Sequence, residues 1–89
     1  MPEARQDGNV ATYIYIWKSG EDEAAVQYSF SPEDGLVGVM SIERRTGDMQ
    51  LLEPCPGDET NTWYQCTCKA VWNHWAVGGL PDSTQYIYG

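Results

Sequence analysis

The sequence predicts an α+β domain: a four-stranded antiparallel β-meander, one C-terminal α-helix packed on one face, and a short extended tail. Three observations lead to this class. The first half of the chain consists of short β-branched and aromatic stretches separated by turn residues. Apolar residues then recur with helical spacing in the second half. Finally, 89 residues suffice for one domain with a single core, so we treat 1–89 as one domain with a flexible polar segment at 1–9.

The strands are predicted from their side-chain alternation and from the turns between them. The stretch at about 10–18, VATYIYIWK, is β-branched and aromatic and ends at Ser19-Gly20. AAVQYSF alternates apolar and polar residues, as a half-buried strand does, and the turn SPEDG follows it. LVGVMSIERR gives the third strand, and the turn Thr46-Gly47-Asp48 leads into the fourth, MQLLE.

The helix is predicted from a change of period after Pro54-Cys55-Pro56-Gly57. Asp58 or Thr60 can cap its start, and Gly78-Gly79 marks its end. One stripe at i, i+4, i+7 and i+11 is expected to face the sheet: Tyr64, Cys68, Val71 and Trp75. Three tryptophans of the helix are expected in the core: Trp63, Trp72 and Trp75. The tail TQYIYG is expected to be extended.

The composition is strongly acidic, and this limits the classes of partner. Thirteen acids against five bases leave a net charge of −8, which disfavours direct binding to nucleic acid or anionic membranes and favours a basic protein partner. A general role in solubility is the alternative explanation of the charge. No apolar run approaches the roughly 20 residues that span a bilayer, and the N-terminus lacks the pattern of a signal peptide, so we expect a cytoplasmic protein.

The meander predicts where the acids gather. Its first and third turns share one end, so Arg44 and Arg45 are expected to offset the acidic run 21–23. The opposite end collects acids with no base nearby in the sequence: Glu33, Asp34, Glu53, Asp58 and Glu59. We predict that these residues form an acidic surface that binds a basic partner. Ordinary turn chemistry and helix capping are the alternative explanation for them.

A second predicted binding surface is aromatic. If Ile14 and Ile16 face the core, then Tyr13, Tyr15 and Trp17 line the face of the sheet that the helix leaves open. Tyr and Trp are favoured at binding surfaces because they combine a large area with a polar tip. The alternative is that the tail, with Tyr86-Ile87-Tyr88, folds over these residues.

The sequence argues against catalysis, a metal site and a cofactor. Three cysteines are an odd number for a disulfide framework, so free thiols are expected, although Cys55 can pair with Cys66 or Cys68. Cys66 and Cys68 point to opposite sides of a helix, and His74 is the only histidine, which is too few ligands for zinc. No nucleophile elbow and no phosphate-binding loop is present. We therefore predict a protein that is not an enzyme.

In outline the chain resembles the small acidic immunity partners of bacterial toxins. The resemblance rests on the strands, the hairpin at Thr46-Gly47-Asp48, the aromatic helix and the segment Gly-Gly-Leu-Pro-Asp at 78–82. It implies a non-catalytic inhibitor that binds a basic toxin or nuclease-like domain and blocks its active site. The alternative is a phage-type anti-defence inhibitor, a DNA mimic or anti-CRISPR-like protein, which requires acids spaced along an extended face. The oligomeric state is left open.

Overall fold

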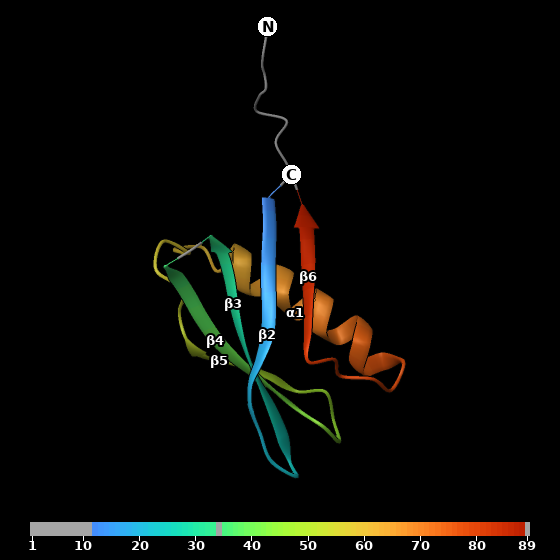
Figure 1. Ribbon diagram of the computed structural model, residues 1–89. Coiled ribbons are helices and arrows are strands. Elements are labelled where there is room, and N and C mark those ends of the chain that lie inside the picture. Colours follow the sequence, from blue (N-terminus) through green and yellow to red (C-terminus); the bar gives the residue numbers. More distant parts are fainter. Residues whose placement is uncertain (1–11, 34, 89) are drawn as a thin grey trace, which may run out of the picture.

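The computed structural model describes residues 12–33 and 35–88, which form an antiparallel sheet with one α-helix on one face (Figure 1). The sheet has five strands in the order β5-β4-β3-β2-β6. The elements are β2 (Thr12–Glu21), β3 (Ala25–Glu33), β4 (Leu36–Glu43), β5 (Met49–Glu53), α1 (Thr62–Ala76) and β6 (Ser83–Tyr88). The predicted α+β class, with an antiparallel sheet and a C-terminal helix, is confirmed.

The sheet has one strand more than predicted, because the tail pairs with β2. Residues 83–88 pair antiparallel with residues 12–17 in a continuous register. Tail and β2 are both rich in aromatic and β-branched residues, which suit such a ladder. The tail therefore lies beside β2 at the edge of the sheet and extends it, and it does not fold over Tyr13, Tyr15 and Trp17 (Figure 1).

Two hydrogen bonds hold the segment that leads into β6. Tyr28 is fully buried, and its hydroxyl donates to the backbone oxygen of Pro81 at 2.7 Å. The backbone N–H of Lys18 donates to the backbone oxygen of Asp82, also at 2.7 Å. Because Lys18 belongs to β2 and Tyr28 to β3, these bonds place the chain against the sheet at the point where β6 begins.

The core lies between α1 and the face of the sheet that packs against it. Alternate residues of the three longest strands point to this face, as the period of two requires. They are Ile14, Ile16, Val26, Tyr28, Phe30, Met40 and Ile42, each at most 1% exposed. The helix contributes Cys66, Thr67, Ala70 and Val71. The core side of β2 is thus the one that the sequence predicted.

The buried stripe of the helix differs from the predicted one. Of the four predicted residues, Val71 is buried, whereas Tyr64, Cys68 and Trp75 are half-buried. Thr67 takes a central place because its hydroxyl donates to the backbone oxygen of Trp63 at 2.8 Å, which satisfies its polar atom. The Trp75 ring stays at the margin, where its Nε1 donates to the backbone oxygen of Arg44 at 2.8 Å.

The expectation that all three helix tryptophans are buried is wrong for Trp72. Trp63 and Trp75 pack against the core, but Trp72 is 44% exposed. Its ring packs against that of Trp75 in a tilted arrangement, with 4.9 Å between the centroids and 34° between the ring planes. It also lies over Gly47, where a Cβ atom would come within 2.9 Å of Trp72 Cζ3 and where φ is +79°. The tight turn before β5 therefore holds Trp72 at the surface.

Asp58 stabilises the start of the helix, as one of the two predicted capping residues. Its Oδ1 accepts from the backbone N–H of Trp63 at 3.1 Å, and its Oδ2 accepts from that of Tyr64 at 3.0 Å. The residue directly before the helix, Asn61, has a left-handed backbone and makes no side-chain cap. The Asp58 carboxylate therefore pairs with N–H groups of the first turn that have no partner inside the helix.

We predict that Val71→Asp unfolds the protein. The side chain is 1% exposed, so the variant buries an unpaired carboxylate at a cost of several kcal/mol, against a total stability of roughly 5–10 kcal/mol. Circular dichroism with thermal melting measures the effect. The matched control is Val77→Asp, the same change at an 82% exposed position, which should fold normally. If both variants fold with wild-type stability, the assigned core is wrong.

Candidate protein-binding face

The face of the sheet opposite α1, here called the open face, is not covered by any element among the described residues (Figure 1). Residues paired across an antiparallel ladder point to the same side, so the register identifies the members of this face. One row across the sheet contains Trp17 together with Ser83, Ser29, Val39 and Glu53. All five strands thus contribute to the open face.

Aromatic side chains of β2 form a ridge along the open face, hereafter the aromatic ridge: Tyr13, Tyr15 and Trp17. All three are exposed, and Ile87 of β6 stands directly opposite Tyr13. On β3, Ser29 and Ser31 are only 6% exposed, although they belong to the same face. These serines lie low between the large side chains of β2 and the valines of β4, so the ridge rises above its surroundings.

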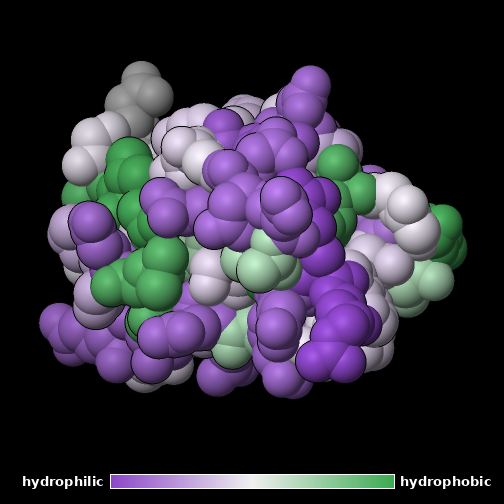
Figure 2. Space-filling view, turned by 90° about the horizontal axis from the view of Figure 1, so that it is seen from below, coloured by the Kyte–Doolittle hydropathy of each residue, from purple (hydrophilic) through white to green (hydrophobic). Residues whose placement is uncertain are grey.

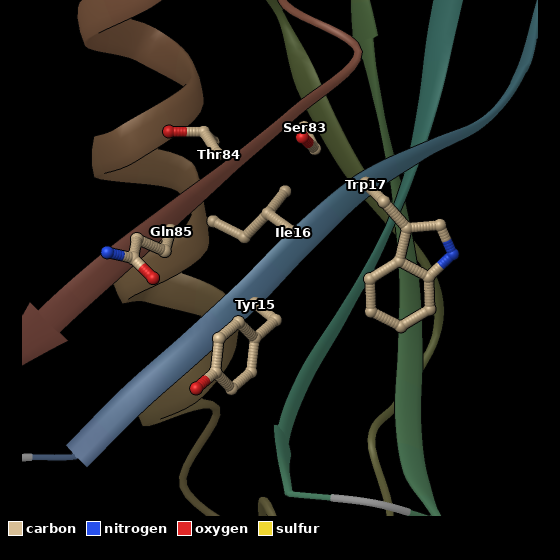
Figure 3. A pocket seen from close by; sticks show the side chains of 6 residues that line it. All are labelled: Tyr15, Ile16, Trp17, Ser83, Thr84 and Gln85. Carbon is tan, nitrogen blue, oxygen red and sulfur yellow. The ribbon is translucent and has the colours of Figure 1, made fainter.

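A shallow depression of about 390 Å³ lies between the aromatic ridge and β6. Figure 3 shows Tyr15 and Trp17 projecting from β2 on one side of the sheet, whereas Ile16 points back toward the helix. Ser83 and Gln85 line the depression from β6 and pair with Trp17 and Tyr15. A small and a polar side chain therefore stand next to two large aromatic ones.

The charged residues of the open face are acidic. Glu43 and Glu53 lie at its β4 and β5 side, in register with Ala25 and Val39. Glu53 is exposed, and the Oε1 of Glu43 accepts from the Thr46 hydroxyl at 2.8 Å. Among the described residues of this face there is no lysine or arginine. The open face therefore combines aromatic area with negative charge.

The structure places the predicted acidic residues in different situations. Glu53 and Glu59 are exposed, and β5 ends beside the start of β4, at the end of the sheet where the β3–β4 turn lies (Figure 1). Asp58 is only 8% exposed and its carboxylate serves the helix, so its assignment to an exposed acidic surface is corrected. Asp34 and the side chain of Glu33 lie outside the described residues.

At the other end of the sheet, the prediction that Arg44 and Arg45 offset the acids 21–23 holds for Arg44, whereas Arg45 forms no ion pair with a described residue. Arg44 Nη2 binds Glu21 Oε2 at 2.6 Å, and its Nε donates to the backbone oxygen of Asp22 at 2.9 Å. Lys18, which the sequence analysis did not consider, binds Glu21 at 3.0 Å and Asp82 at 3.2 Å. Figure 2 looks onto this end, and hydrophilic side chains fill the centre of the view.

Hydrogen bonds lower the pKa of two acids in the first turn, Glu21 and Asp22. Hydrogen bonds from Lys18 and then from Arg44 hold the pKa of Glu21 below its usual value. Asp22 Oδ1 accepts from the backbone N–H groups of Ala25 and Ala24 at 2.8 Å each, which lowers the pKa of Asp22. The first acidic cluster is thus engaged within the protein.

The three cysteines are free thiols: Cys55 and Cys66 are buried and Cys68 is half-buried. Burial raises the pKa of each, which keeps the thiols protonated and weakly nucleophilic at neutral pH. His74 Nε2 is 3.0 Å from the Thr84 hydroxyl oxygen. Within residues 12–33 and 35–88, no three His, Cys, Asp or Glu side chains form a group that could hold a metal ion.

Apart from Glu53, the open-face residues outside β2 were not predicted from the sequence, chiefly Val37, Ser83, Gln85 and Ile87. The stretches LVGV and TQYIY alternate as strands do, which divides their residues between two faces. Which of the two faces is the open one can be decided only when the neighbouring strand and its register are known. The ladder between β2 and β6 supplies that neighbour.

No family model matches the chain, and no curated protein or solved structure matches it either. Among the described residues, no helix is long and apolar enough to cross a membrane.

We predict that Glu21→Gln lowers the melting temperature near about pH 6 but not near about pH 2. The pKa of Glu21 is depressed by folding, so its contribution is present above the unfolded pKa of about 4.3 and is lost as pH falls through the folded value. Because the carboxylate is exposed, the expected change is a few degrees at most. Calorimetry across this pH range measures it.

The matched control is Glu23→Gln, in the same turn, since Glu23 is exposed and forms no ion pair with a described residue. Its melting temperature should follow that of the wild type at every pH. A Glu21→Gln effect of equal size at both pH values would show that the ion pair is not its cause.

Proposed function

We propose that this chain is a non-catalytic binding protein that docks a basic protein through its open face and blocks it, as an immunity protein blocks a toxin domain. The observation that carries the proposal is the exposed aromatic ridge on a sheet face that no described element covers. Contiguous patches of large apolar side chains are rarely exposed on monomeric proteins, and where they occur they often mark an interaction site. The acids of the same face and the net charge of −8 select a basic partner.

The aromatic ridge suits the centre of such an interface. Tyr and Trp are enriched among the residues that dominate binding energy, because they bury a large area at a small cost in side-chain entropy. Here Tyr15 and Trp17 stand on a strand held by ladders on both sides, to β3 and to β6. They are therefore positioned before the partner arrives, which lowers the ordering cost of association.

The exposed acids suit the rim. Glu53 stands on the open face, and Glu59 lies in the segment between β5 and α1. Exposed charges at a rim mainly speed the encounter with an oppositely charged partner. The acids of the first turn contribute less, since Arg44 and Lys18 already bind Glu21.

We predict that Tyr15→Ala or Trp17→Ala weakens partner binding by about 2 kcal/mol or more, mainly through faster dissociation. The partner to test first is the protein encoded immediately upstream of this chain's gene, with affinity measured by surface plasmon resonance and inhibition by rescue of cell growth. Trp72→Ala is the matched control, since Trp72 is 44% exposed against 38% for Trp17 but belongs to the helix. Wild-type affinity in both ridge variants would contradict the proposal.

A second prediction concerns charge. Reversing Glu53 and Glu59 to Lys should slow association by about tenfold or more at low salt. The effect should become smaller as the salt concentration rises to about 0.5 M, where the Debye length is only about 4 Å. The control reverses Glu23 and Asp48, two exposed acids from the turns at the other end, with the same change in net charge. Equal slowing by both pairs would show that only net charge matters and not its position.

A further inference from the structure

Among the described residues, no strand pairs with the outer edge of β6, which lies next to the aromatic ridge. The strand β6 is the last strand of the sheet on the β2 side and contains no proline and no charged residue. The opposite edge strand, β5, has five residues and an irregular register, and Pro54 follows it. Short length, bulges, charges and proline are the features that keep an edge strand from pairing with another chain. Within the strands themselves, only β5 has a charged residue and an irregular register, so among the described strands β6 is the edge more open to a further strand.

The register identifies the backbone groups that face outward from this edge. The N–H of Lys18 donates to the oxygen of Asp82, so these two residues form a hydrogen-bonded pair. Such pairs alternate along an antiparallel ladder, so Thr84 and Tyr86 also direct their N–H and C=O groups at β2. The intervening residues 83, 85 and 87 direct theirs away from the sheet. In the described part of the chain, no other segment pairs with them.

The side chains of these three residues lie on the open face, in register with the aromatic ridge. Ser83 and Gln85 line the depression of about 390 Å³ that ends at Tyr15 and Trp17 (Figure 3). A strand added beside β6 lies about 10 Å from β2, because neighbouring strands are about 4.8 Å apart. Its long side chains can then cross the small Ser83 and reach the aromatic rings.

Charge and aromatic character select the side chains that fit. The Asp82 carboxylate lies largely exposed at the start of β6, even though Lys18 binds it at 3.2 Å. No described lysine or arginine belongs to β6 or to the open face. A lysine or arginine placed over Trp17 or Tyr15, within about 6 Å of the ring, gains a cation–π interaction. An acidic strand would meet repulsion instead.

We propose that the basic partner supplies an extended segment that pairs with β6 as an additional antiparallel or parallel strand. Its Lys or Arg side chains, at alternate positions, enter the depression beside Tyr15 and Trp17. Backbone hydrogen bonds to residues 83, 85 and 87 supply affinity, and the alternate basic side chains supply selectivity. This inference rests on the proposed function and specifies the conformation and chemistry of the segment that is bound.

The test uses a nine-residue peptide in which lysine and valine alternate, with a second peptide in which glutamate replaces lysine. Hydrogen exchange followed by NMR is measured on the full chain with and without each peptide, and Trp fluorescence reports contact with the aromatic ridge. The lysine peptide should slow exchange of the outward amides of Gln85 and Ile87 by about tenfold or more at saturation. The inward amides of Thr84 and Tyr86, already in the ladder, should change little.

Two variants of one position separate strand pairing from contact with the face. Gln85→Pro removes an outward N–H and places a ring at the edge, so it should abolish protection and weaken binding at least tenfold. Gln85→Ala keeps the N–H, so it should keep the peptide-dependent protection of the Ile87 amide that Gln85→Pro abolishes. The exchange pattern of the wild-type protein tests the proposal without either variant.

Three outcomes would overturn the inference. If the lysine peptide changes Trp fluorescence without protecting Gln85 and Ile87, the face binds but the edge does not, and the proposed function stands alone. If neither peptide binds, or both bind equally, the basic extended segment is wrong, while the neighbouring-gene partner still tests the proposed function. If those amides become protected at higher protein concentration without peptide, a second copy of this chain occupies the edge.

Discussion

The chain has one helix among its described residues, and this helix buries one face of the sheet. This constraint decides which strand residues form the core and which are exposed on the opposite face. The helix α1 has 15 residues and packs against a sheet of five strands, so it covers a single face. Ile14 and Ile16 turn to the helix, and the alternation of β2 then forces Tyr13, Tyr15 and Trp17 to the other side. The exposed aromatic ridge is thus a direct consequence of the buried core on the same strand.

Polar atoms that are buried or half-buried connect the elements that keep this arrangement in place. The Tyr28 hydroxyl holds Pro81 before β6, and the Trp75 indole holds the backbone of Arg44 in the turn before β5. The Asp58 carboxylate binds the first turn of the helix. Each of these groups finds a backbone partner in another part of the chain, so satisfying buried polar atoms also fixes the relative positions of helix, turns and last strand.

The sequence predicted the class of fold, the four meander strands, the helix and the two sides of β2, because each follows from local periodicity. It did not predict the pairing of β6 with β2, since a contact between segments about 70 residues apart leaves no local pattern. The buried side of α1 was predicted in the wrong position around the helix. Thr67 is polar, and the sequence does not show that its hydroxyl is satisfied by the backbone oxygen of Trp63. Asp58 was predicted both as a helix cap and as a member of the acidic surface. Its burial in the structure supports the first role and excludes the second.

The central claim is that the open face is the working surface of this protein. The most direct measurement is the footprint of a bound basic partner on the isotope-labelled chain, obtained by cross-saturation NMR of its side chains. The account predicts strong effects at Tyr13, Tyr15, Trp17 and Ile87 and none at two exposed residues away from the open face, Trp72 in the helix and Val77 directly after it. A footprint centred on Trp72 and Val77, with the aromatic ridge unchanged, would contradict it.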